Sequence, residues 1–123
     1  MRIASLGSGS RGNATLVQHE ETTLLIDNGF SLKQFTRRLD RFEIDPASID
    51  AVLLTHEHGD HSGGIERLCN NHEIPLWTAV GTARAALAPE FKYHRLVAGQ
   101  SVTIGGIEVF PVTVPHDASE PLQ

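Results

Sequence analysis

The 123-residue sequence predicts one α/β or α+β domain built around a mixed β-sheet. Strand-like runs at both ends of the chain enclose a central part in which strand and helix patterns alternate, a pattern typical of sheets covered by helices. The hydrophobic fraction of 40% supports one core, while the length is too short for two ordinary domains. No apolar run approaches the roughly 20 residues that cross a bilayer, so we expect no membrane-spanning helix.

The N-terminal part is predicted to contain three strands. Residues 2–6 form a short strand, and the glycine- and serine-rich residues 7–13 form the turn after it. Residues 15–18 and 23–27 have the pattern of a hairpin with a short turn between its strands.

A helix is predicted to begin near Ser31. Leu32, Phe35, Leu39 and Phe42 recur at spacings of three and four residues, which places their side chains on one face of a helix. Ser31 carries the hydroxyl group that commonly caps the first helical turn.

The middle of the chain contains the predicted central strand. Residues 49–55 form a nearly continuous apolar run, typical of a strand covered on both faces, and this run ends directly at His56. Two more helices are expected at residues 62–71 and 82–87, with a short strand at residues 76–78 between them. A C-terminal hairpin is expected from strands at residues 102–104 and 107–114.

Composition excludes several classes of protein. The single cysteine, Cys69, lies among apolar helix positions and is interpreted as a core residue rather than a nucleophile. It forms no intrachain disulfide, and the first residues lack the apolar stretch of a signal peptide, so we expect a cytoplasmic protein. The formal charge of −5 argues against a surface built to neutralise many phosphates.

Four residues with metal-binding side chains directly follow the predicted central strand: His56, His58, Asp60 and His61. Imidazole and carboxylate groups are the ligands that ions such as zinc prefer. In an extended segment His56 and His58 point the same way, and a turn at Gly59 would redirect the next two ligands toward a second ion. A solvated polar loop is the alternative, but four titratable groups at the end of a buried strand repel one another unless a cation holds them.

Two further residues are candidates for the same site. His116 closes another apolar strand and would bring an imidazole beside the cluster, although taken alone a loop histidine is an equal alternative. Asp27 ends a strand of the first hairpin and is interpreted either as an acceptor that fixes a histidine tautomer or as a turn-forming residue. The other histidines, His19, His72 and His94, are interpreted as surface residues.

This set of residues resembles the signature of the metallo-β-lactamase superfamily, with the central pattern His56-x-His58-x-Asp60-His61, an upstream Asp27 and a downstream His116. Residues 8–13 and 116–121 are similar to the YycJ/WalJ-like branch, whose members are regarded as nucleases. Arg11 stands where that branch usually has a small residue. The resemblance extends over the whole chain and implies an αββα sandwich, two facing β-sheets between helices, with metals at one edge.

The resemblance also implies which residues bind metal. His56, His58 and His116 would hold one ion, and Asp60 and His61 would hold a second. Asp27 would support the ligands as a hydrogen-bond acceptor behind them. Two divalent ions are expected, zinc first, with manganese and iron as alternatives.

Domains of that superfamily extend further than this chain and carry two more ligands in their second half. Residues 1–123 are therefore expected to be a metallo-β-lactamase-like domain that is incomplete at its C-terminus, in effect an N-terminal half. The parent protein is expected to be an enzyme, and the activity of this chain alone stays open.

The expected function is metal-dependent hydrolysis at a dinuclear site. Metal-bound hydroxide would attack the substrate, and Asp60 would orient or ligate that water. Phosphodiesters of nucleic acid are the first expected substrate, with a lactam or a thioester as the alternative. A non-catalytic metal-binding half-fold is the alternative from another class. An isolated half would expose an apolar sheet face, which predicts a homodimer.

Overall fold

The computed structural model describes residues 1–113 of the chain. Over this range the chain forms eight strands, four α-helices and one 3-10 helix, in the order β1 (Arg2–Gly7), β2 (Ala14–His19), β3 (Thr22–Ile26), α1 (Leu32–Asp40), η1 (Pro46–Ser48), β4 (Ala51–Leu54), α2 (Gly59–Ser62), α3 (Ile65–His72), β5 (Leu76–Thr78), α4 (Val80–Ala86), β6 (His94–Arg95), β7 (Val102–Ile104) and β8 (Ile107–Val109).

Six of these strands form one sheet, in which the order in space is the order in sequence, β1-β2-β3-β4-β5-β6. β1, β2 and β3 pair antiparallel, whereas β3, β4, β5 and β6 pair parallel. The predicted mixed sheet and the first predicted hairpin are therefore confirmed. The central position of β4 explains its sequence, because all four of its residues are buried between neighbours on both sides.

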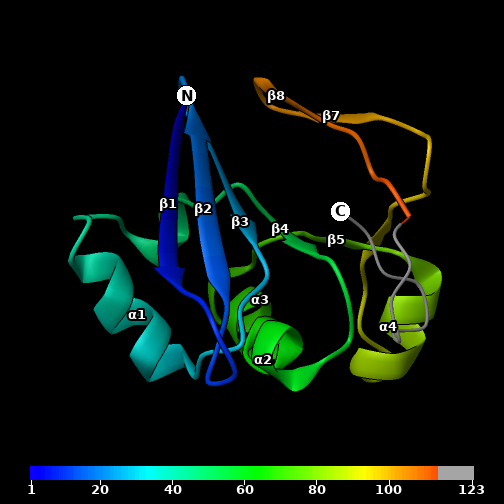
Figure 1. Cartoon of the computed structure of the whole chain (residues 1–123), viewed down its shortest axis with the longest axis horizontal. Helices are drawn as coiled ribbons and strands as arrows, with labels where there is room; N and C mark the ends of the chain where they lie inside the picture. Colours follow the sequence, from blue (N-terminus) through cyan, green and yellow to red (C-terminus); the bar gives the residue numbers. More distant parts are fainter. Residues whose placement is uncertain (114–123) are drawn as a thin grey trace.

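The two faces of this sheet are covered by different elements. One face packs against α1 and α3, in a core that includes Leu16, Leu25, Phe35 and Leu68. The other face packs against the separate β7–β8 hairpin through a smaller apolar cluster that includes Ile107. Figure 1 shows α1, α2 and α3 on one side of the sheet and the β7–β8 hairpin on the other. The molecule thus has a helix layer, a large sheet and part of a second sheet, which agrees with the predicted fold class.

Helix α1 begins where the sequence predicts. The Ser31 hydroxyl accepts a hydrogen bond from the Gln34 amide at 3.3 Å, so the predicted cap is present. Phe35 and Leu39 are both 0% exposed, which confirms the predicted apolar face. On another side of the helix, the Arg38 guanidinium donates a hydrogen bond of 2.6 Å to the Leu6 carbonyl oxygen and so ties α1 to the end of β1.

Three elements differ from the prediction. The helix predicted at residues 62–71 is two helices, α2 and α3, separated by Gly63 and Gly64. A Cβ at Gly64 would overlap the Phe30 carbonyl oxygen, so only glycine fits where the two helices meet the preceding loop. The last predicted strand stops at Val109, two residues before Pro111, which has no amide hydrogen for a ladder. The two-residue strand β6 was not predicted, because His94 and Arg95 are polar and exposed.

Among the described residues, Met1, Ile3, Phe110 and Val112 are large hydrophobic residues that are 53–76% exposed. Within residues 1–113, no helix combines the length and the apolar character that crossing a membrane requires.

Candidate metal centre

The candidate site lies at the edge of the sheet where β3 and β4 end. These strands are parallel neighbours, so their carboxyl ends meet at the same edge. Asp27 follows β3, and Thr55 and His56 follow β4. The Asp27 amide donates a hydrogen bond of 2.8 Å to the Leu53 carbonyl oxygen, which continues the parallel pairing up to the site. The sheet therefore brings together residues that are 28 and 29 positions apart in sequence.

The Asp27 carboxylate is the centre of a hydrogen-bond network. Oδ1 accepts from the Thr55 amide at 2.8 Å, and Oδ2 accepts from the Thr55 hydroxyl at 2.7 Å. Oδ2 also accepts from Nδ1 of His61 at 2.7 Å. Asp27 is 5% exposed and has a positive φ of 63°, a backbone conformation that aspartate adopts more readily than most residues. The carboxylate thus links the ends of two strands to a histidine on α2.

These hydrogen bonds fix the tautomers of two histidines. A hydroxyl has one hydrogen, so Thr55, which donates to Asp27, accepts from Nδ1 of His56 at 2.9 Å. A carboxylate only accepts, so Nδ1 of His61 carries the hydrogen that Asp27 receives. In the neutral form, each ring then has its lone pair on Nε2, which is the nitrogen that would bind a metal.

The protonation of His61 follows from the same contacts. The hydrogen bond to Asp27 raises the pKa of His61 above its ordinary value of 6.5, and burial of the ring opposes this rise. The negative charges of Asp27 and Asp60 raise the pKa further. Because a histidine binds metal only when it is deprotonated, a proton and a metal ion compete for this ring.

Helix α2 places the rest of the predicted cluster. The sequence predicts an extended segment followed by a sharp turn at Gly59, whereas residues 59–62 form one helical turn that begins after His58. Amides of His61 and Ser62 donate to the His58 carbonyl oxygen, each at 2.9 Å. The turn brings the His61 ring back to 3.9 Å from the His56 ring, between centroids, while the His58 ring lies 4.9 Å from that of His56. All three imidazoles are therefore grouped.

Two loops hold α2 in place. The Asn13 amide donates to the Asp60 carbonyl oxygen at 2.7 Å, and the Asn13 side chain donates to Asp60 Oδ2 at 3.0 Å. From the other side, the Asn28 amide donates to the His61 carbonyl oxygen at 2.8 Å. A Cβ on Gly29 would overlap the Asp60 backbone, so the loop after β3 approaches α2 as closely as a backbone can. The orientation of Asp60 and His61 is consequently set by the protein itself.

The donor atoms of Asp27, His56 and His61 lie within 4.8 Å of one another, close enough for one ion to reach all three. Two imidazoles and one carboxylate are a donor set that suits zinc and related divalent ions. His58 and Asp60 lie beside this group without joining it; the Asp60 carboxylate is 3.6 Å from Nε2 of His61. The chemistry and spacing of the donors therefore fit a metal ion. His116 lies outside the described residues.

Sequence reasoning missed the residues that position the ligands. Thr55 was included only as the end of the apolar strand, although a hydroxyl directly before a histidine cluster is a signal for a supporting hydrogen bond. The sequence alone gives Asn28 no role at the site, yet it is 0% exposed, and its side chain accepts from the Phe30 amide at 3.0 Å. The contact of Asn13 with Asp60 joins residues 47 positions apart, and no local sequence pattern predicts this contact.

Comparison with known proteins identifies relatives by sequence. Residues 7–121 match the model of the metallo-beta-lactamase superfamily. The chain is 32% identical to the exodeoxyribonuclease YycJ of Bacillus anthracis, over 99% of this chain and 48% of that protein. It is also 32% identical to the exodeoxyribonuclease WalJ of Streptococcus pneumoniae, over 98% of this chain and 47% of that protein. The chain thus spans about half the length of these curated relatives, and the predicted resemblance to the YycJ/WalJ-like branch is confirmed.

Solved structures support the same fold. A subclass B3 metallo-beta-lactamase from a soil metagenome library, MEM-A1, superposes with a TM-score of 0.80 at 20% identity, covering 98% of this chain and 52% of that one. A metallo-beta-lactamase from Cronobacter sakazakii superposes with a TM-score of 0.82 at 19% identity, with the same coverage of both chains. At these identities the likeness extends to the fold alone.

Proposed function

Because the chain belongs to the metallo-beta-lactamase superfamily, we propose that it carries the metal-binding part of a metal-dependent hydrolase that cleaves phosphodiester bonds in nucleic acid. The observation that carries the proposal is the grouping of the His56, His58 and His61 rings at the carboxyl edge of the sheet, with the Asp27 carboxylate beside them. Two relatives named as exodeoxyribonucleases, each matched over nearly the whole of this chain, support DNA as the substrate.

The metal ligands of the proposed site are His56, His58 and His116 for one divalent ion and Asp60 and His61 for a second. Zinc is the proposed metal, and manganese and iron accept the same ligands. The grouping of the three described imidazoles supports this assignment. Asp27 already accepts hydrogen bonds from Thr55 and His61, which supports a role behind the ligands.

Bound divalent ions would supply a water molecule of lowered pKa and polarise the scissile phosphodiester. The residues of the chain would orient the water and the metal ligands. Asp60 would orient the attacking water and receive its proton, while the Asn13 side chain holds the Asp60 carboxylate at 3.0 Å. Thr55 and Asp27 would keep His56 and His61 in the tautomers that present Nε2.

A second candidate concerns the 123-residue chain by itself: metal binding without turnover. The chain spans about half the length of the curated relatives, and three of its side chains by themselves are close enough to hold an ion. Titration with zinc followed by a nuclease assay on the purified chain tests this second candidate. Binding without turnover supports it, and hydrolysis by the chain alone contradicts it.

The proposed function is tested with the product of the complete reading frame. We expect it to contain bound metal by elemental analysis and to hydrolyse DNA, with loss of hydrolysis after treatment with a chelator. His58→Ala is expected to lose activity and part of the metal, whereas His72→Ala, at the C-terminal end of α3, is the matched control and is expected to keep both. Full activity and full metal content in His58→Ala would contradict the proposal.

A further inference from the structure

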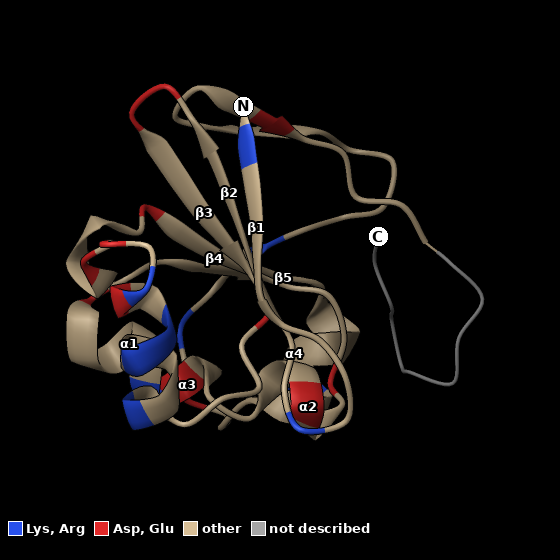
Figure 2. Ribbon diagram, turned by 60° about the vertical axis from the view of Figure 1, so that its left-hand side comes forward, with Lys and Arg blue, Asp and Glu red and all other residues tan. Residues whose placement is uncertain are grey.

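The positive charge of this acidic chain is gathered around one helix. The chain has 10 Lys and Arg residues against 15 Asp and Glu residues. Half of the basic residues line two hollows that both border α1, namely Arg11, Lys33, Arg37, Arg38 and Arg67. Among residues 1–113, the acidic side chain that lines these hollows is Asp40. Figure 2 shows the concentration of Lys and Arg on α1.

The hollow nearer the metal centre, here named the Gly-Ser hollow, has a volume of about 370 Å³ and is lined by residues 7–12, Phe30 and Arg38. Two of its lining residues are arginines and none is acidic. Ser8 and Ser10 supply hydroxyl groups to this lining. The lining is therefore suited to a phosphate group.

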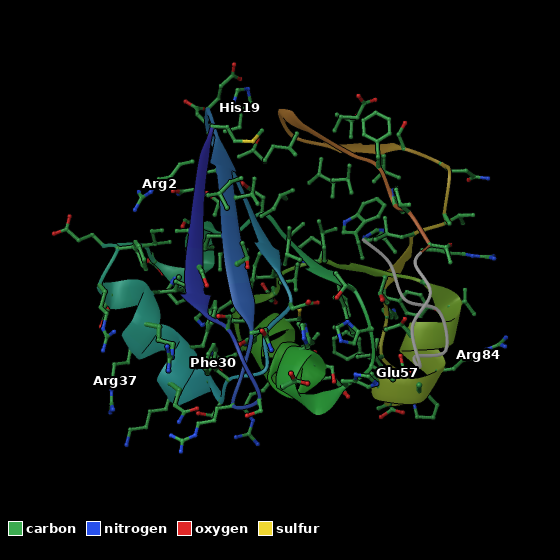
Figure 3. The ribbon with its side chains drawn as sticks, viewed as in Figure 1. Arg2, His19, Phe30, Arg37, Glu57 and Arg84 are labelled. Carbon is green, nitrogen blue, oxygen red and sulfur yellow. The ribbon has the colours of Figure 1, made fainter. Side chains whose placement is uncertain are left out.

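Arg38 is held rigidly in this hollow. Its guanidinium carbon lies 4.1 Å from the centroid of the Phe30 ring, and Nη1 donates a hydrogen bond to the Leu6 carbonyl oxygen. Guanidinium has five N–H donors, so this contact orients the group while using only one of them. Figure 3 shows Phe30 between α1 and the loop that joins β1 to β2. Arg11, in contrast, is exposed at the rim of the hollow.

Hydrogen bonds of the Asn13 side chain connect the loop that lines the hollow to the metal centre. The Asn13 side chain closes the loop by accepting from the Gly9 amide at 3.1 Å and donating to the Gly9 carbonyl oxygen at 2.8 Å. The same side chain also donates to Asp60 Oδ2 at 3.0 Å. Asn13 therefore contacts both the loop that lines the hollow and Asp60, which is a proposed metal ligand.

We infer that the Gly-Ser hollow is a phosphate subsite for the nucleic-acid strand whose scissile bond lies at the metal centre, with Arg11 and Arg38 as its cationic groups. The inference rests on the proposed function. The strand continues along α1, where Lys33, Arg37 and Arg67 line the second hollow. This arrangement explains how a chain with a formal charge of −5 binds a polyanion: the basic residues are concentrated where the strand passes.

The first test measures binding without turnover, in the product of the complete reading frame and with EDTA present. The dissociation constant of a fluorescent single-stranded oligonucleotide is measured by anisotropy over a range of salt concentrations. Arg11→Ala is expected to weaken binding about tenfold and to lower the slope of log K against log salt by about 1, as loss of one phosphate contact does. Arg11→Lys, which keeps the charge, is expected to retain most of the slope.

The matched control is Arg84→Ala. Arg84 is exposed on α4 and lines neither hollow, and Figure 3 places it on the opposite side of the molecule from Arg37. Binding by Arg84→Ala is expected to equal that of the unmodified protein. If Arg11→Ala binds the oligonucleotide with unchanged affinity and an unchanged salt slope, the inference is overturned.

A second measurement separates this inference from the proposed function. Bis(p-nitrophenyl) phosphate is a phosphodiester without a neighbouring phosphate, so Arg11→Ala is expected to lose less activity with this compound than with DNA, for which KM rises about tenfold. If the unmodified protein hydrolyses neither compound but Arg11→Ala still weakens oligonucleotide binding, the proposed hydrolysis fails and the phosphate subsite stands.

Discussion

Nδ1 of His61 donates a hydrogen bond of 2.7 Å to Oδ2 of Asp27, and this contact connects a histidine on α2 to the end of β3. The same oxygen receives the Thr55 hydroxyl, so one atom fixes the geometry on both sides of the candidate metal centre. A single conservative substitution of Asp27 therefore tests the role of this contact.

Asp27→Asn is expected to weaken metal binding by about 10- to 100-fold, the usual effect of removing a group that orients a histidine ligand. Asparagine tolerates the positive φ of 63° at this position, and its remaining oxygen can keep the bond to the Thr55 amide. Its amide nitrogen cannot accept from Thr55 and His61. Competition with a chromogenic chelator measures the affinity, and Asp40→Asn, on the exposed surface of α1, is the control. Equal affinities in the two variants would contradict this role for Asp27.

Gly29→Ala is expected to displace Asp60, because its Cβ would overlap the Asp60 backbone. Gly59→Ala is a matched control on the neighbouring segment, since a Cβ at Gly59 meets nothing within 4 Å. We expect the Gly29 variant to lose metal binding and nuclease activity and the Gly59 variant to keep both. Circular dichroism checks that each variant is folded, and metal content is then compared. Similar metal content in two folded variants would contradict the predicted role of the close approach.

Cys69 is expected to make stability fall at alkaline pH. Burial raises the pKa of the Cys69 thiol to about 12 from its ordinary value of 9.0. Between these values the unfolded chain releases a proton that the folded chain keeps, so the free energy of unfolding decreases as pH rises, by up to about 1.4 kcal/mol per pH unit. Urea unfolding at pH 8 and pH 10 measures this change. Cys69→Ala is expected to show a smaller decrease, and identical pH slopes would count against the prediction.

Phe35→Ala is expected to destabilise the chain by about 3–5 kcal/mol, because Phe35 is fully buried between α1 and the sheet. Ser31→Ala, which removes only the cap of the same helix, is expected to cost about 1 kcal/mol. Chemical denaturation of both variants tests the order of the two effects. A larger loss from the cap than from the core would contradict the packing described for α1.

The 123-residue chain is expected to form a homodimer. Ile3, on the edge strand β1 of the large sheet, is 68% exposed, and Met1, directly before this strand, is 76% exposed. Phe110 and Val112, after β8, are 63% and 53% exposed. Pairing through such surfaces removes apolar area from water. Light scattering measures the mass, and substitution of Ile3 by Lys is expected to shift the equilibrium toward monomer. A monomer at high concentration of the unmodified chain would contradict the prediction.

The sequence predicts elements whose stability is local or comes from continuous burial. The spacing of Phe35 and Leu39 defines α1, and the apolar run of residues 51–54 defines the central strand. The histidine cluster is recognisable because its four members lie within a span of six residues. The supporting contacts are different in kind: Asn13 reaches Asp60, and Asp27 reaches Thr55, only after the sheet has formed. Such pairings depend on tertiary structure and leave no periodic trace in the sequence.

The split between α2 and α3 illustrates the same limit. Gly63 and Gly64 are visible as weak helix formers, but the need for glycine comes from the Phe30 carbonyl oxygen, which a Cβ at Gly64 would overlap. Because that oxygen belongs to a loop more than 30 positions away, local propensity could not locate the break.

The agreement between strand order and chain order bears on how the protein is made. Each strand of the large sheet pairs with the one synthesised immediately before it, from β1 to β6. During translation, every newly emerged strand can add to the outer edge of what has already assembled, and none has to insert between strands that are already paired. Vectorial folding on the ribosome would therefore form the antiparallel hairpins of β1, β2 and β3 first. The parallel pairing of β3 with β4, which places the histidine cluster, would form afterwards.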